Sequence, residues 1–323
     1  MKKKAQNKAD KFAPFISRRE SRIPALIITL LVVISFAITS FYAYRFIRVT
    51  FIDKLDTGDL YALWSNGDYQ SVFSLSDQLL EQSPFDNSVR TLHGFSSFWI
   101  AVSETDPLRA QTFLDTAINS MRIALYSARK TAAPQIEYML GKAYYYKDSL
   151  SAYHYYADLV VKYLLAAREK GYQAEDMAEY LGLSYAALGM TEKSIAYFTE
   201  ALQYRDSDVL ALAVAEQYCK AGLYAEAEPY LLRLAVKTGD EALLFKSRSL
   251  LGQIYFSQRQ FDRALVEYQA VLEKDPASAD AYYGIGLIYE ELGDAVLARA
   301  QWRRALQIHG NHPGALQKMA GAR

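Results

Sequence analysis

The hydrophobic and polar positions divide the chain into one long apolar run and a much longer stretch of amphipathic segments. The apolar run covers residues 23–44, IPALIITLLVVISFAITSFYAY, and contains no Asp, Glu, Lys or Arg. Beyond it, apolar residues recur at intervals of three and four, a spacing that places them on one side of an α-helix. Because no segment reads convincingly as a strand, the pattern predicts an all-α protein.

The uncharged run predicts a transmembrane helix over residues 23–44. Its 22 residues would extend about 33 Å as a helix, enough to cross a bilayer. Pro24 suits the first turn of a helix, and Tyr42 and Tyr44 suit the membrane interface. A cleaved signal peptide is the alternative, but its apolar region would be shorter, and no A-x-A-like site follows here.

The charges beside this run predict its orientation. Residues 1–22 carry eight Lys/Arg against two acidic residues, a net charge of +6, whereas only Arg45, Arg48 and Lys54 follow within ten residues of the run. The positive-inside rule therefore predicts a basic cytosolic tail over residues 1–22 and a C-terminal part outside the cytosol, in the periplasm if the source is bacterial. Its rival is a C-terminal part that faces the cytosol.

Two short patterns alternate through the remainder of the chain. In the first, an apolar residue precedes a small one and an aromatic residue follows three positions later, as in Leu251-Gly252-Tyr255. In the second, a small residue is followed after four positions by a bulky one and after three more by an apolar or small one. Examples of the second are Ala110-Leu114-Ala117, Ala152-Tyr156-Leu159, Ala264-Tyr268-Val271 and Ala298-Trp302-Ala305. Turn sequences such as ELGDAVLA separate the patterns, so each period predicts two helices joined by a tight turn.

This arrangement resembles the tetratricopeptide repeat family, whose period is 34 residues. Its clearest copy is residues 245–278, and residues 279–312 follow directly in the same register. The resemblance implies a right-handed solenoid of helical hairpins, with about seven units over residues 45–312 and a short capping segment over residues 313–323. Tyr144 and Tyr156 occupy pattern positions and are expected in the core.

Two units depart from this period. Ala110 and Gly141 are 31 residues apart and Ala152 and Gly182 are 30 apart, against 22 from Ala264 to Gly286. We therefore expect the second helices of the units at 87–128 and 134–172 to be about two turns longer.

The first helices of such a solenoid line its concave surface, so their outward positions form a candidate groove for a partner. These positions lie three residues before and one, four and five residues after the small residue of the first pattern. The predicted partner-binding residues are Phe95, Phe98, Trp99, Tyr138, Lys142, Tyr145, Tyr146, Glu179, Glu216, Lys220, Tyr283, Glu290 and Glu291. Exposed aromatic residues are typical interface anchors. The alternative is that the lengthened second helices, or a helix near residues 45–64, cover the aromatic members.

Charge and composition exclude other classes of function. Outside residues 1–22 the chain carries 28 basic and 34 acidic residues, a net charge of −6, which disfavours nucleic acid as a partner. One cysteine, Cys219, permits neither an internal disulfide nor a cysteine zinc site. His309 and His312 lack a third metal ligand, and the adjacent Glu290 and Glu291 diverge by about 100° on a helix, unsuited to an acid and base pair. We expect no enzyme activity, no cofactor and no metal.

The predicted function is that of a membrane-anchored scaffold or assembly factor that binds a protein or peptide partner. Its architecture is similar to that of envelope proteins with one N-terminal span and tetratricopeptide repeats, so a membrane-associated partner is favoured. Some family members clamp acidic chaperone tails, but this groove offers Lys142 and Lys220 with no asparagine, so a basic or apolar peptide fits better. The alternatives are a cytosol-facing receptor for chaperones or cargo, and a carrier of an apolar small molecule.

Overall fold

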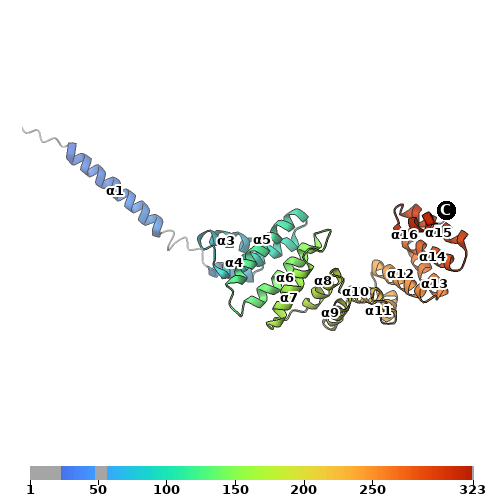
Figure 1. Cartoon of the computed structure of the whole chain (residues 1–323). Helices are drawn as coiled ribbons and strands as arrows, with labels where there is room; N and C mark the ends of the chain where they lie inside the picture. Colours follow the sequence, from blue (N-terminus) through green and yellow to red (C-terminus); the bar gives the residue numbers. More distant parts are fainter. Residues whose placement is uncertain (1–22, 48–56, 322–323) are drawn as a thin grey trace, which may run out of the picture. The chain divides into compact units, whose positions relative to one another are not determined.

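The computed structural model describes residues 23–47 and 57–321, and every regular element in these ranges is an α-helix. The chain divides into two compact units, Met1–Asp59 and Leu60–Arg323. The described helices, most of which are labelled in Figure 1, are α1 (Ile23–Ile47), α2 (Thr57–Ser65), α3 (Tyr69–Gln82), α4 (Asn87–Ser103), α5 (Pro107–Tyr126), α6 (Ala133–Ser149), α7 (Ala157–Glu169), α8 (Met177–Ala187), α9 (Thr191–Tyr204), α10 (Asp208–Lys220), α11 (Tyr224–Lys237), α12 (Glu241–Ser257), α13 (Phe261–Lys274), α14 (Ala279–Glu291), α15 (Ala295–Ile308) and α16 (Pro313–Gly321).

The first unit contributes the helix α1, which runs without interruption for 25 residues. Side chains are described for residues 33–45, and all of these are exposed. Among the described residues, no helix combines the length and the apolarity needed to cross a membrane. Part of the predicted span, the side chains of residues 23–32, lies outside the described residues, as does the predicted basic tail at residues 1–22.

The second unit is a succession of helical hairpins, which confirms the prediction of an all-α solenoid for the described residues. From α4 to α15 the described helices form six hairpins, and each of these helices packs chiefly on its neighbours along the chain. The helices α2 and α3 precede them and are joined by a three-residue turn. Most hairpin turns are three residues long, with a positive φ at the middle position. Glycine occupies this position in turns such as Gly189 (φ 70°), and Arg259 (φ 59°) adopts the same conformation in the α12–α13 turn.

The two helices of a hairpin meet where the small residue of the first helix lies against a bulky residue of the second. A Cβ atom built on Gly182 would lie 2.5 Å from the ring of Phe198, and one on Gly252 would lie 2.7 Å from the ring of Tyr268. The small residue therefore permits an approach that any side chain would prevent. This is the packing that the two alternating patterns predict.

The two longer units differ from the sequence-based expectation. The helix α5 has 20 residues against 14 in α9, but α7 has 13, so the prediction of a lengthened second helix is wrong for α7. There the additional residues form a seven-residue turn between Ser149 and Ala157. Ala152 and Tyr156 lie in this turn, and the α7 residues that fill the core are Val160, Leu164 and Ala167, each 0% exposed. Tyr156 is half-buried, whereas Tyr144 is buried as predicted.

The first helices of successive hairpins form one layer of the array. Some helices also contact the helix two places further along the chain. The main contacts of this kind join α4 with α6, α6 with α8, α10 with α12, and α12 with α14, and each of these is the first helix of its hairpin. Because the first helices approach one another more closely than the second helices do, their layer is the inner side of the array. We call its solvent-facing side the inner surface.

Candidate partner-binding surface

The inner surface carries a group of half-buried aromatic side chains on α4, α6 and α8. Trp99 comes from α4, Tyr145 and Tyr146 from α6, and Tyr180 from α8. Tyr145 lies 4.7 Å from Tyr180 and 5.7 Å from Tyr146, measured between ring centroids. These four residues, which we call the aromatic patch, join three successive hairpins, so their rings are held by the packing of first helix on first helix.

A buried lysine lies within the aromatic patch. The ammonium group of Lys142 is 5.8 Å from the ring centroid of Trp99 and 5.3 Å from those of Tyr138 and Tyr180. Its charge is paired with Asp176, whose Oδ2 atom lies 2.9 Å from Nζ. Tyr138 donates its hydroxyl to the other oxygen of the same carboxylate. The lysine is thus neutralised within the site and stabilised by aromatic faces.

The pKa values of Tyr138, Tyr145 and Tyr180 are all raised above the ordinary tyrosine value, so these three phenols stay protonated at physiological pH. Burial raises the pKa of Tyr138, and the hydrogen bond to Asp176 raises it further. Burial likewise raises the pKa of Tyr180, with the Tyr146 hydroxyl as the next cause, and burial raises the pKa of Tyr145. Neutral phenols supply apolar faces and hydrogen bonds, which are the kinds of contact found in protein interfaces.

Several aromatic residues predicted to face a partner are buried instead. Phe95 is 4% exposed and Phe98 is 0% exposed, so neither is available to a partner and their assignment to the groove was wrong. The ring centroid of Trp64 in α2 lies 6.0 Å from that of Phe95, and the ring centroid of Tyr146 lies 5.5 Å from that of Phe98. Tyr138 and Lys142 are also buried, whereas Trp99, Tyr145 and Tyr146 keep part of their surface exposed. The alternative in which a helix near residues 45–64 covers the aromatic residues therefore holds for Phe95, because Trp64 packs on it.

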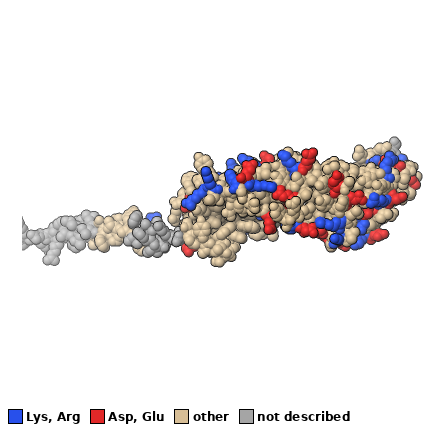
Figure 2. All heavy atoms as spheres, turned by 90° about the horizontal axis from the view of Figure 1, so that it is seen from below, with Lys and Arg blue, Asp and Glu red and all other residues tan. Residues whose placement is uncertain are grey.

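The predicted acidic end of the groove is largely neutralised by ion pairs. The ion pairs are Glu179 with Arg205, Glu216 with Lys246, Glu290 with Lys318, and Glu291 with Arg259. Tyr283 packs on His312 with ring centroids 4.9 Å apart, and Lys220 is exposed. Figure 2 shows the same intermingling, with acidic and basic side chains side by side over much of the array. This end therefore presents paired charges with little net field.

The histidines His93 and His312 have polar partners, and the one cysteine is half-buried. His312 lies 2.9 Å from Asp280, and His93 lies 2.8 Å from the Ser120 hydroxyl. In the described ranges no group of three or more His, Cys, Asp and Glu residues is placed to hold a metal ion. Burial raises the pKa of the Cys219 thiol to about 11, which suppresses the reactive thiolate at neutral pH.

Residue-by-residue reasoning missed three contributors to this surface. Tyr180 lies two positions before Gly182, which is not one of the four positions used to select groove residues. Around the helix axis, however, it is only about 20° from one of them, the position five residues after Gly182. Asp176 lies in the turn before α8, beyond the reach of a helical pattern. Tyr69 of α3 stacks on Trp99 at 5.8 Å, a contact between hairpins that no local spacing indicates.

Comparison with known proteins supports the repeat assignment. Family models described as tetratricopeptide repeat match residues 181–208 and 280–312, and one described as TPR repeat matches residues 252–293. The chain thus contains tetratricopeptide repeats, as the sequence patterns predicted. A search of curated proteins finds no match.

Solved structures share the fold at low sequence identity. The C-terminal part of a TPR repeat-containing protein from Cytophaga hutchinsonii is 15% identical, with a TM-score of 0.55 over 81% of this chain and 98% of that one. The apo form of the quorum sensor NprR from B. thuringiensis is 18% identical, with a TM-score of 0.53 over 83% of this chain and 78% of that one. At these identities the similarity shows the solenoid fold alone.

Proposed function

We propose that this protein is a scaffold or assembly factor that binds a polypeptide partner through the aromatic patch of its inner surface. The observation that carries the proposal is the set of half-buried rings of Trp99, Tyr145, Tyr146 and Tyr180 held together on three first helices. Aromatic side chains fixed by packing lose little conformational entropy on binding, which makes them effective interface anchors. With Lys142 neutralised by Asp176, the patch suits an apolar or basic peptide segment.

We further propose that residues 23–44 anchor the protein in a membrane and that the repeats lie outside the cytosol. The support is the absence of charged residues in this segment, the continuous helix α1, and the excess of Lys/Arg in residues 1–22. A partner that is itself membrane-associated follows from such an anchor. Protease added to sealed vesicles of known sidedness tests the orientation, because only exposed repeats are digested.

The partner is tested by photocrosslinking in native membranes. A photoreactive phenylalanine analogue at Tyr145 places the probe in the aromatic patch, and the same analogue at Asp158, which is exposed on α7, is the control. We expect a discrete protein adduct from position 145 alone, identified by mass spectrometry. Equal labelling from both positions, or none from either, contradicts a partner at the aromatic patch.

A further inference from the structure

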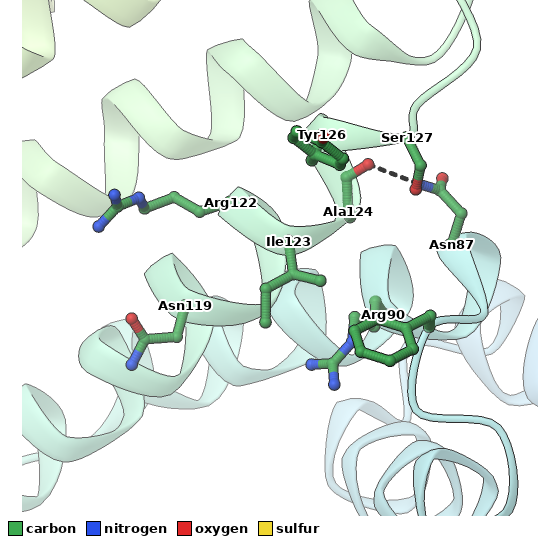
Figure 3. A pocket seen from close by; sticks show the side chains of 9 residues that line it. Asn87, Arg90, Asn119, Arg122, Ile123, Ala124, Tyr126 and Ser127 are labelled. Carbon is green, nitrogen blue, oxygen red and sulfur yellow. Dashed lines mark hydrogen bonds between the residues drawn. The ribbon is translucent and has the colours of Figure 1, made fainter.

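A cavity lies at the end of the α4–α5 hairpin opposite its turn, and none of the residues that line it belongs to the aromatic patch. Its volume is about 650 Å³, and its walls come from the α3–α4 loop, the start of α4 and the last turns of α5. Phe85, Arg90, Ile123 and Tyr126 are among the residues that line it (Figure 3). Its size lies within the range of pockets that enclose a ligand group.

Hydrogen bonds fix the walls of this cavity. The side-chain amide of Asn87 donates to the carbonyl oxygen of Ala124 and lies 3.1 Å from the Ser127 hydroxyl, which joins the start of α4 to the end of α5. Arg90 donates its Nε–H to the carbonyl of Pro84 in the α3–α4 loop. The cavity is thus a preformed feature of the hairpin, so a ligand would bind with little ordering of the protein.

The cavity presents apolar surface that the described chain does not cover. Among the lining residues, Phe85 is 81% exposed, Tyr126 is 97% exposed and Ile123 is 39% exposed. Aromatic side chains that are this exposed beside a concave surface are typical of interaction sites.

Positive charge without a carboxylate partner lies beside the cavity. Arg90 and Arg122 line it, Arg129 and Lys130 come shortly after the lining residue Ser127 in the chain, and none of the four forms an ion pair with another described residue. Arg122 also has a side-chain hydrogen bond with Tyr144. Residues 87–103 and 116–136 contain no Asp or Glu. In the view of Figure 3, Arg90 and Arg122 lie on opposite sides of Ile123.

Several basic groups elsewhere in the described array do have a carboxylate partner. Lys147 pairs with Asp115, and Arg248 pairs with Glu267 at 2.8 Å. Asp86 is the nearest carboxylate in sequence to the wall residue Asn87, and it accepts the backbone N–H of Val89 as the N-cap of α4. The chain outside residues 1–22 has a net charge of −6, so the cavity is a positive site on an acidic body.

We infer that this cavity is a second docking site, and that it binds an acidic segment of a partner polypeptide that also carries a bulky apolar side chain. The guanidinium groups of Arg90 and Arg122 pair with carboxylates of the segment, because unpaired arginines favour bidentate contact with such groups. Phe85, Ile123 and Tyr126 enclose the apolar side chain. A membrane surface fits less well, since a bilayer cannot enter a concave cavity, whereas one side chain of a peptide can.

The inference is tested by selecting from a library of random peptides displayed on phage, with the full chain as bait. Peptides that also bind the double variant Arg122→Glu/Tyr126→Ser are removed first, which discards ligands of the aromatic patch. We expect the remaining peptides to combine Asp or Glu with an aromatic or aliphatic residue. No enrichment over the double variant, or enrichment of peptides without acidic residues, overturns the inference.

One enriched peptide, labelled with fluorescein, then gives affinities by fluorescence anisotropy. Arg122→Glu should weaken binding by about tenfold or more, because it replaces attraction by repulsion, and added salt should weaken binding to the native protein. The matched controls are Arg303→Glu, an exposed arginine of α15, and Tyr204→Ser, an exposed tyrosine at the end of α9; both should bind as the native protein does. Equal losses in the controls contradict the site.

A lipid ligand is distinguished in the same assay. Vesicles of phosphatidylglycerol should neither displace the peptide nor bind in a manner that depends on Arg122. Displacement by these vesicles would mean that the cavity recognises anionic headgroups and would overturn the peptide assignment. A failure of crosslinking at Tyr145 would leave this result unaffected, because the two surfaces share no residue.

Discussion

The ring of Tyr268 lies directly against Gly252, so a Cβ atom at position 252 would lie 2.7 Å from the ring carbon Cζ. The same ring meets Gly284 of α14 on another side, and Tyr268 is only 4% exposed. One side chain of α13 therefore packs on glycines of two successive first helices, α12 and α14. This contact couples neighbouring repeats, on which the stability of a solenoid depends.

The substitution Gly252→Ala should destabilise the array. In an open helix this change would stabilise by about 1 kcal/mol, but here the added methyl group overlaps a buried ring that has little room to move. We expect a loss of about 1–3 kcal/mol in the free energy of unfolding, measured by urea denaturation. Gly239→Ala is the control, because a Cβ atom at position 239 meets nothing within 4 Å. A Gly252→Ala protein as stable as the control would show that the helices separate at little cost.

The packing of the regular repeats could be predicted because it depends on local spacing. A small residue and a bulky residue at fixed positions of adjacent helices meet whenever the connecting turn is three residues long, as in the α12–α13 hairpin. The unit with the longer turn broke this rule. Ala152 and Tyr156 have the right spacing but lie outside a helix, because Asp148 accepts the backbone N–H of Tyr156 and α7 begins only at Ala157.

The candidate surface was less predictable, because exposure depends on contacts between distant segments. Helical geometry placed Phe95 and Phe98 on the inner face, and their burial by Trp64 and Tyr146 arises from neighbouring helices. The same geometry grouped Tyr145, Tyr146 and Trp99 on this face, and the structure leaves all three half-buried. Helical geometry could not predict the role of Asp176, because this residue lies in the turn before α8, where its carboxylate pairs with Lys142.

Removing the carboxylate at position 176 should destabilise the aromatic patch. Asp176→Ala leaves the ammonium of Lys142, whose side chain is 11% exposed, without its partner at 2.9 Å. We expect a loss of about 1–3 kcal/mol, because a buried charge is left without a charged hydrogen-bond partner. The double variant Lys142→Met/Asp176→Ala should recover part of that loss in urea denaturation, since it removes the stranded charge. If the double variant is no more stable than Asp176→Ala, the pair is not coupled as described.

Asp148 should hold the seven-residue turn between α6 and α7 in place. Its buried carboxylate accepts the backbone N–H of Tyr156 at 2.8 Å and lies 2.8 Å from Nδ1 of His154. Asp148→Ala removes both contacts, and Tyr153 and Tyr155 in the turn are exposed to chymotrypsin. We expect cleavage there to become about tenfold faster, which corresponds to about 1.4 kcal/mol of local opening. Asp158→Ala, a change at an exposed carboxylate on α7, should leave the rate unaltered.

The stability of the array should decrease in mild acid because of His93. Burial lowers the pKa of this imidazole below its ordinary value of 6.5; the charge of Asp77 opposes the shift and that of Arg90 adds to it. The ring stacks on Phe73 with centroids 4.7 Å apart, and its Nδ1 atom lies 2.8 Å from the Ser120 hydroxyl. Below pH 6.5 the unfolded chain therefore binds a proton at His93 that the folded chain does not yet bind.

Linkage then gives the sign of the effect. The stabilisation is fully present above pH 6.5, the ordinary value for the group, and is lost as the pH falls toward the lowered pKa of the folded state. The measurement is the free energy of unfolding of native protein and of His93→Gln between about pH 7.5 and pH 5. The difference between them should shrink as the pH falls, because the variant lacks the titrating group. A constant difference for His93→Gln would mean that His93 is protonated as readily in the folded chain as in the unfolded one.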